Sequence, residues 1–208
     1  MAASEPAPTT KRSPLAMAVL ALLEYKPLHP YGVQRLLKEW GKDGVVNVGQ
    51  RAGLYKTMDR LLAAGLIQVR ETGRDQQYPE RTVYEPTDAG RATSHQWIEE
   101  ILAVPRNEFP EFPAALSFAM AVGPDVALSA LERRQAALTV SLAEARKAVE
   151  DSVGYGLPRI TLLDDEYAIA VTAAELAWVT GVVEDLKSGA LPWDTERLAA
   201  FATTTPDV

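Results

Sequence analysis

Apolar side chains recur at helical spacing in the N-terminal half of the chain. In the stretch from Gln50 to Ile67 they fall at i, i+4, i+7 and i+8, at Leu54, Met58, Leu61 and Leu62. Gly65 stands where a helix C-terminal cap belongs, and a strand-like run begins at Leu66. The pattern predicts a helix with a buried back that is joined directly to a β-strand.

Two further helices are expected before this one. Ser13-Pro14 places a capping serine before a proline at the first helical position, and Pro27 ends that helix. His29 is expected to cap the second helix, which begins at Pro30. The expected apolar faces of the two helices are Leu15, Val19, Leu22 and Leu23, and Val33, Leu36, Leu37 and Trp40.

A hairpin and a fourth helix follow. The charged loop over 73–80 is too long for a tight turn and predicts an exposed wing, and 81–85 is its return strand. Thr87 is expected to cap the fourth helix, whose apolar edge is Trp97, Ile98, Ile101 and Leu102. A basic, amide-bearing helix joined to a hairpin is typical of a winged helix that binds DNA.

The C-terminal half predicts an antiparallel helical hairpin. A short helix over 114–122 comes first. A long helix from Pro124 carries a heptad seam at Leu128, Leu131, Gln135, Leu138, Leu142, Ala145 and Val149. The last helix, 163–187, aligns Leu163, Tyr167, Ala170, Ala174, Ala177 and Gly181, and this small-residue face is expected to pack against the long helix.

These elements give a mostly α fold with a small β-hairpin. We expect a flexible arm over 1–12, a winged-helix domain over 13–104, a helical dimerisation and effector region over 105–202, and a loose tail over 203–208. No cysteine is present, the N-terminus lacks the apolar core of a signal peptide, and no run of about 18 apolar residues occurs. A cytoplasmic protein without a membrane span is the resulting expectation.

The net charge of −7 is unevenly distributed. Residues 1–104 hold 13 basic and 12 acidic side chains, a net of +1, whereas 105–208 hold 8 and 16, a net of −8. Within 31–81 the count is 9 basic to 6 acidic. Any DNA-facing surface is therefore expected in the N-terminal half.

Several of these motifs resemble the PadR family of bacterial transcriptional regulators. The matching segments are His29–Gln34, Val48–Gln50 with Leu54–Lys56, Leu61–Ile67, Pro79–Tyr84, Thr87–Arg91 and Pro105–Phe109. The order and spacing agree from about residue 13 to 115. The resemblance implies a homodimer with a winged helix on each subunit, a C-terminal dimerisation region, and repression of a pseudo-palindromic operator that a small molecule relieves. Gly53 departs from the family pattern and weakens the recognition helix by up to about 1 kcal/mol.

The DNA-binding candidates lie on the third helix and the wing. Gln and Arg pair with adenine and guanine through two hydrogen bonds each, which suits Gln50 and Arg51 at the start of the helix. Tyr55 is expected at a phosphate or sugar or, alternatively, against the second helix. Lys56 and Arg60 suit phosphates, although Arg60 has Asp59 and Glu39 as local alternatives. The remaining candidates are Tyr31, Arg74, Arg81 and Lys11-Arg12.

The effector candidates are aromatic residues near the expected junction of the two halves. Trp97, Phe109, Phe112 and Trp178 would wall an apolar pocket for a small aromatic or apolar effector, with core or interface packing as the alternative. Phe118 is of the same kind. No buried charge with an obvious partner is expected on these elements, and the carboxylates of Glu108, Glu111, Asp164, Asp165 and Glu166 are expected in solvent.

Other functional classes find less support in the sequence. The only histidines, His29 and His95, lack ligand spacing, and no nucleophile, phosphate-loop or dinucleotide motif occurs. No metal, cofactor or enzymatic activity is therefore expected. Two alternatives to an operator-binding regulator stay open, namely a winged-helix protein-interaction module and an effector-binding scaffold without an operator.

Overall fold

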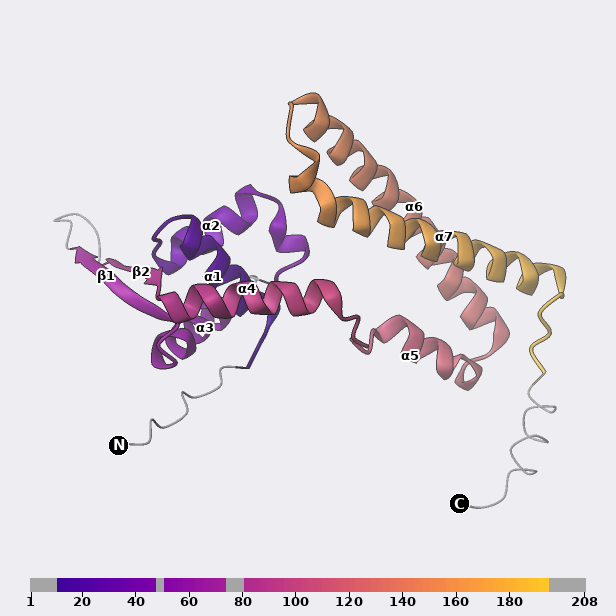
Figure 1. Cartoon of the computed structure of the whole chain (residues 1–208). Coiled ribbons are helices and arrows are strands. Elements are labelled where there is room, and N and C mark those ends of the chain that lie inside the picture. The colour runs from indigo at the N-terminus through magenta and orange to yellow at the C-terminus, as the bar shows by residue number, and fades with distance from the viewer. Residues whose placement is uncertain (1–10, 48–50, 74–80, 195–208) are drawn as a thin grey trace, which may run out of the picture. The chain divides into compact units, whose positions relative to one another are not determined.

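The structure of the protein, a computed structural model, describes residues 11–47, 51–73 and 81–194 (Figure 1). It divides into two compact units, Met1–Asn107 and Glu108–Val208. The first unit combines helices with a two-stranded antiparallel sheet, and the second is helical. The predicted fold class, a winged helix followed by an antiparallel helical region, is confirmed.

Three helices form the core of the first unit: α1 (Pro14–Tyr25), α2 (Pro30–Glu39) and α3 (Arg51–Ala63). A short 3₁₀ turn, η1 (Lys42–Gly44), follows α2. Both predicted caps are present, because the Ser13 hydroxyl accepts the Ala16 N–H at 3.2 Å and His29 Nδ1 accepts the Gly32 N–H at 2.9 Å. These bonds satisfy amide donors that the first turn of a helix leaves unpaired.

The buried faces follow the predicted stripes with two exceptions. Val33, Leu36 and Leu37 are buried as expected, but Trp40 is 46% exposed, because it ends α2 and packs edge-on against Tyr25 at 5.6 Å. On α3, Leu62 is 37% exposed, and the nearly inaccessible Thr57 takes a place on the buried face. The core residues are Ala16, Val19, Leu20, Leu22, Leu23, Leu28, Val33, Leu36, Leu37, Val46, Leu54, Met58, Leu61 and Ile67.

The hairpin pairs β1 (Ile67–Gly73) with β2 (Arg81–Pro86), and its register shifts between Val69 and Glu71. A third segment joins it at its base. Leu28, in the turn between α1 and α2, donates its N–H to Tyr84 O at 3.1 Å and accepts the Tyr84 N–H at 2.9 Å. The return strand is therefore hydrogen-bonded on both edges at Tyr84.

Helix α4 (Asp88–Ala103) closes the first unit over α1. Thr87 caps it as predicted, accepting the Gly90 N–H at 3.1 Å. Gly90 lies so close to Leu66, the residue before β1, that a Cβ on Gly90 would lie 1.9 Å from Leu66 O. An ion pair from Arg12 to Glu100 at 2.8 Å and a hydrogen bond between His95 and Glu24 at 3.0 Å tie the helix to the α1 segment.

The second unit contains α5 (Glu111–Ser117), η2 (Ala119–Ala121), α6 (Pro124–Gly154), η3 (Arg159–Leu162) and α7 (Leu163–Ser188). The prediction that the short helix spans 114–122 is wrong. Helix α5 begins three residues earlier and ends before a separate 3₁₀ turn. Pro113 fits in its first turn, because the N–H groups there have no partner within the helix.

Helices α6 and α7 pack against each other as the expected hairpin, but through a different face of α7. The predicted face is largely exposed: Tyr167 is 72% exposed, and Ala170, Ala174 and Ala177 are exposed too. Leu162, Val179 and Val183 are buried instead. Larger apolar side chains remove more surface from water, so the branched stripe rather than the alanine stripe faces α6.

The heptad seam of α6 does face the interior of this hairpin. Leu142 is buried, the other seam residues are half-buried, and Gln135 Nε2 donates to Thr180 Oγ1 on α7 at 2.9 Å. Lys187 pairs with Glu132 at 2.7 Å near one end. Gln135 therefore occupies its seam position with a polar partner opposite it.

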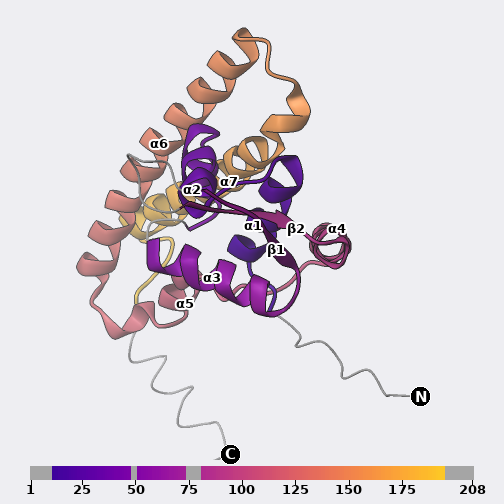
Figure 2. The ribbon, with the colours of Figure 1, turned by 90° about the vertical axis from the view of Figure 1, so that its left-hand side faces the viewer.

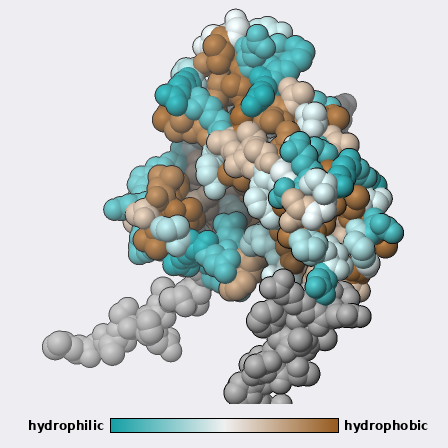
Figure 3. Space-filling view, turned by 90° about the vertical axis from the view of Figure 1, so that its right-hand side faces the viewer, coloured by the Kyte–Doolittle hydropathy of each residue, from teal (hydrophilic) through white to brown (hydrophobic). Residues whose placement is uncertain are grey.

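By length and composition alone, one helix in the described part of the chain could cross a membrane: Arg159–Ser188, whose mean hydropathy reaches 1.3. The segment contains acidic residues, so it is not an uninterrupted run of about 18 apolar residues. Only 11% of that window is buried. The window includes the exposed α7 face, and Figure 3 shows patches of apolar side chains on the surface.

Candidate nucleic-acid interface

Helix α3 has one buried face and one polar, exposed face. Leu54, Met58 and Leu61 are each at most 2% exposed, which fixes the helix on the core. On the other side Tyr55 is 50% exposed, and Lys56 and Arg60 are exposed beside it. A rigid helix that carries cationic and aromatic side chains on its open face is suited to lie in a DNA groove.

The two cations on this face differ in their partners. Arg60 Nη2 donates to Thr57 Oγ1 at 3.3 Å, and neither Asp59 nor Glu39 takes the bond that the sequence offered as an alternative. Lys56 has no ion-pair partner within the described ranges. Its ammonium group is therefore available to a phosphate.

Part of the predicted interface lies outside what the structure describes. Gln50 and Arg74 fall outside the described residues, and so do the side chains of Arg51 and Arg81. Arg51 is the first residue of α3 and Arg81 the first of β2. Their backbone positions agree with the sequence prediction, and their roles at DNA stay predictions.

The hairpin lies beside α3 (Figure 2). Burial raises the pKa of the Tyr84 phenol on β2, and the nearby Asp59 carboxylate and Tyr55 hydroxyl on α3 raise it further. The phenol therefore stays neutral between the strand and the recognition helix. The Leu28 bonds and the packing of Tyr84 against the core together fix the base of the hairpin on the first unit.

Helix α2 carries the candidate Tyr31 and two cations that the sequence analysis did not select. Tyr31 is 56% exposed, as a phosphate contact requires, and its ring stacks on His29 with the centroids 6.0 Å apart. Arg35 pairs with Glu39 at 3.3 Å, and Lys38 is exposed one turn later. Their spacing along the outward face of α2 was the signal that could have identified them.

One sequence candidate, Arg12, and one further cation, Arg70, are engaged within the protein. Arg12 is only 18% exposed, because its guanidinium pairs with Glu100. On the hairpin, Glu85 accepts from Gln68 at 3.0 Å and from Arg70 at 3.4 Å. A phosphate would have to compete with a carboxylate for Arg12 and for Arg70.

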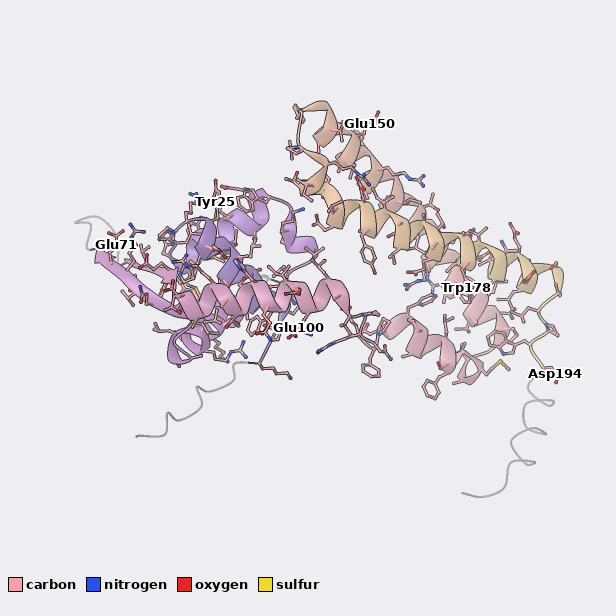
Figure 4. The ribbon with its side chains drawn as sticks, viewed as in Figure 1. Tyr25, Glu71, Glu100, Glu150, Trp178 and Asp194 are labelled. Atoms are coloured by element: carbon pink, nitrogen blue, oxygen red, sulfur yellow. The ribbon has the colours of Figure 1, made fainter. Side chains whose placement is uncertain are left out.

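The effector candidates separate between the units. Trp97 is partly buried against the core of the first unit, and Phe109 is 82% exposed with a positive φ of 52°. In the second unit, Phe112 meets Trp178 edge-on at 6.2 Å (Figure 4). The effector roles of these four residues stay predictions.

Two of the groups considered in the sequence analysis lie at ion pairs in the second unit. The Phe112 ring lies 3.5 Å from the Arg134 guanidinium, which is paired with Glu175, and both partners of that pair are partly exposed rather than buried. Glu166 is also ion-paired, to Arg159 at 2.8 Å. The hydrogen bond from Arg159 is the main reason why the pKa of Glu166 lies below its usual range.

The chain resembles several solved structures in fold. Bacillus subtilis PadR in complex with operator DNA matches with a TM-score of 0.67 at 19% identity, over 83% of this chain and 98% of that one. The same protein in complex with p-coumaric acid matches with a TM-score of 0.67 at 18% identity, over 83% of this chain and 98% of that one. The Vibrio cholerae virulence activator AphA matches with a TM-score of 0.62 at 17% identity, over 84% of this chain and 98% of that one. No curated protein sequence matches the chain.

The resemblance extends to sequence as well as fold. Residues 19–96 match the family described as the transcriptional regulator PadR-like family, and this range runs from within α1 to within α4. It therefore includes the recognition helix, the hairpin and the Gly90 contact described above. Over this winged-helix segment, the chain matches the transcriptional regulator PadR-like family.

Proposed function

We propose that the protein is a sequence-specific DNA-binding regulator that reads a pseudo-palindromic operator with α3 and the hairpin. The observation that carries this proposal is the geometry of α3, whose apolar back is fixed on the core while Tyr55, Lys56 and Arg60 are open to solvent. Operator DNA bound to Bacillus subtilis PadR, which has a similar fold, supports the same use here.

We further propose that the protein acts as a homodimer. The exposed α7 face supports this, because Leu163, Tyr167, Val171 and Trp178 are each at least 47% exposed on one helix. Apolar surface of this extent is rare on monomeric proteins. A two-fold dimer would present two α3 helices to half-sites about one helical turn, roughly 34–36 Å, or a multiple of it apart.

We propose repression relieved by a small aromatic or apolar effector as the mode of action. The p-coumaric acid complex of Bacillus subtilis PadR supports a small aromatic ligand. The Vibrio cholerae relative of similar fold is an activator, so the sign of regulation must be measured. A reporter driven by the operator should lose expression when the protein is produced and regain it with the effector.

Lys56→Ala should weaken binding to all DNA sequences about equally. Loss of one phosphate contact should also reduce the slope of log affinity against log salt by roughly one, because one fewer counterion is released. Fluorescence anisotropy with operator and random duplexes between 50 and 200 mM salt, roughly the range over which such binding changes most, measures both quantities. Lys147→Ala in the second unit, where Lys147 pairs with Asp151, is the matched control and should leave the slope unchanged. A wild-type protein without salt-dependent duplex binding would favour the protein-interaction module or the scaffold without an operator.

Arg51→Ala should instead reduce discrimination between sequences. A side chain that makes two hydrogen bonds to a guanine contributes about 1–3 kcal/mol of preference for that base. The ratio of operator to random-duplex affinity should therefore fall by roughly 10-fold to 100-fold. Equal losses on both duplexes would show that Arg51 reads no base.

A further inference from the structure

Three side chains from three helices meet around one aromatic ring in the second unit. Phe112 comes from α5, Arg134 from α6 and Trp178 from α7. The Phe112 ring lies with its centroid 3.5 Å from the Arg134 guanidinium carbon, and meets the Trp178 ring at an interplanar angle of 79°. The ring is thus held by a cation on one side and an aromatic ring on another.

The two groups that hold the ring would remain in place without it. Arg134 Nε donates to Glu175, which anchors the guanidinium on α7 from across the hairpin. In the part of the chain that the structure describes, the Arg134 Nη nitrogens donate to no protein acceptor. The Arg134 side chain is 36% exposed, so the site opens to solvent on the side of the guanidinium.

The element that supplies the ring is weakly held. Helix α5 has only seven residues, and Pro110 before it provides no side-chain cap. Phe109 adopts a φ of 52°, a backbone conformation that costs a non-glycine residue free energy. Residues 104–110 are all exposed. The cost of withdrawing Phe112 is therefore small compared with that of disturbing α6 or α7.

We propose that Phe112 is the internal occupant of a ligand site, and that a free planar aromatic acid displaces its ring. The ligand ring takes the place of the Phe112 ring against Trp178, and its carboxylate accepts from the Arg134 Nη nitrogens. Displacement frees α5 and with it the segment that joins the two units. The inference rests on the proposed function and deepens its effector role. It makes Phe112 a competitor of the ligand rather than a wall of the pocket.

The test is the direction in which Phe112 substitutions change affinity. Titration calorimetry of the full chain with p-coumaric acid, without DNA, should show about tenfold tighter binding for Phe112→Ala and Phe112→Leu, because the cation–π and aromatic contacts no longer compete. Phe112→Trp should bind more weakly than wild type, because the larger ring occupies the site better. Phe118→Ala removes a phenyl ring that is 75% exposed and should leave affinity unchanged.

Loss of affinity in both Phe112→Ala and Phe112→Leu would make Phe112 a wall of the site and overturn the inference. So would unchanged affinity, or the absence of binding in every variant at millimolar ligand. Arg134→Met should abolish binding in the Phe112→Leu background, and the helical circular dichroism of each variant reports its folding. Operator binding is measured separately. If the Phe112 variants bind p-coumaric acid more tightly but the protein has no affinity for an operator, the proposed function is rejected and this site is kept. If the protein binds an operator but the Phe112 variants do not bind p-coumaric acid more tightly, only the site is rejected.

Discussion

Gly90→Ala is expected to lower the free energy of unfolding of the N-terminal unit by about 3 kcal/mol or more. The added methyl group would lie 1.9 Å from Leu66 O and 2.9 Å from the Leu66 carbonyl carbon, which are backbone atoms that cannot rotate away. The same Leu66 oxygen accepts the Thr87 N–H at 3.0 Å, so the clash falls on the junction of α4 and the hairpin. Overpacking at a rigid contact typically costs 1–3 kcal/mol, occasionally more, hence about 3 kcal/mol here. Urea unfolding followed by circular dichroism measures the change.

Gly53→Ala is the matched control for this substitution. A Cβ at Gly53 meets nothing within 4 Å, and the residue lies in α3. Alanine there should stabilise the protein by about 0.5–1 kcal/mol, because it restricts the unfolded chain and favours the helix. If both substitutions had the same small effect, the close approach of Gly90 to Leu66 would not be a feature of the folded protein.

Ala174→Lys is expected to convert the homodimer into a folded monomer. Ala174 is exposed on the α7 face, so lysine is tolerated by a single chain. In a symmetric contact through this face two ammonium groups would be buried without partners, at a cost of several kcal/mol. Dimer affinity should fall by on the order of 10³-fold. Sedimentation at micromolar concentration measures the change.

Ala148→Lys on α6 is the control for the dimer prediction. Ala148 is also exposed, but its neighbours one turn away include Glu144 and Asp151, which suit a solvated surface. This variant should remain a dimer. If both lysine variants stayed dimeric, the interface would lie on another surface, and a wild-type monomer would reject the homodimer itself.

The first unit could be predicted closely from sequence because its signals are local. Ser13, His29 and Thr87 each cap a helix through an amide three residues ahead, and Gly65 ends the recognition helix with a positive φ of 68°. The stripe Leu54, Met58 and Leu61 needs only the helical period to be recognised. Here periodicity and capping chemistry point to the same structure.

The second unit was harder to predict because α7 is apolar on two faces. An alanine stripe and a branched stripe both satisfy the helical period, and only the volume that α6 must fill decides between them. The contact of Phe112 with Arg134 and Trp178 joins residues far apart in sequence, and no short motif marks it. The same holds for the candidate interface. The ion pair of Arg12 with Glu100 joins residues 88 positions apart, so the local sequence does not reveal that Arg12 is already paired.

The reciprocal hydrogen bonds between Leu28 and Tyr84 also determine where the protein can tolerate new sequence. They anchor β2 to a turn that lies 56 positions earlier in the chain. Because this anchor is outside the hairpin loop, insertions or deletions between the two strands should leave the root of β2 and helix α3 in place. A change of loop would then alter the contacts with DNA while the folded head stays the same.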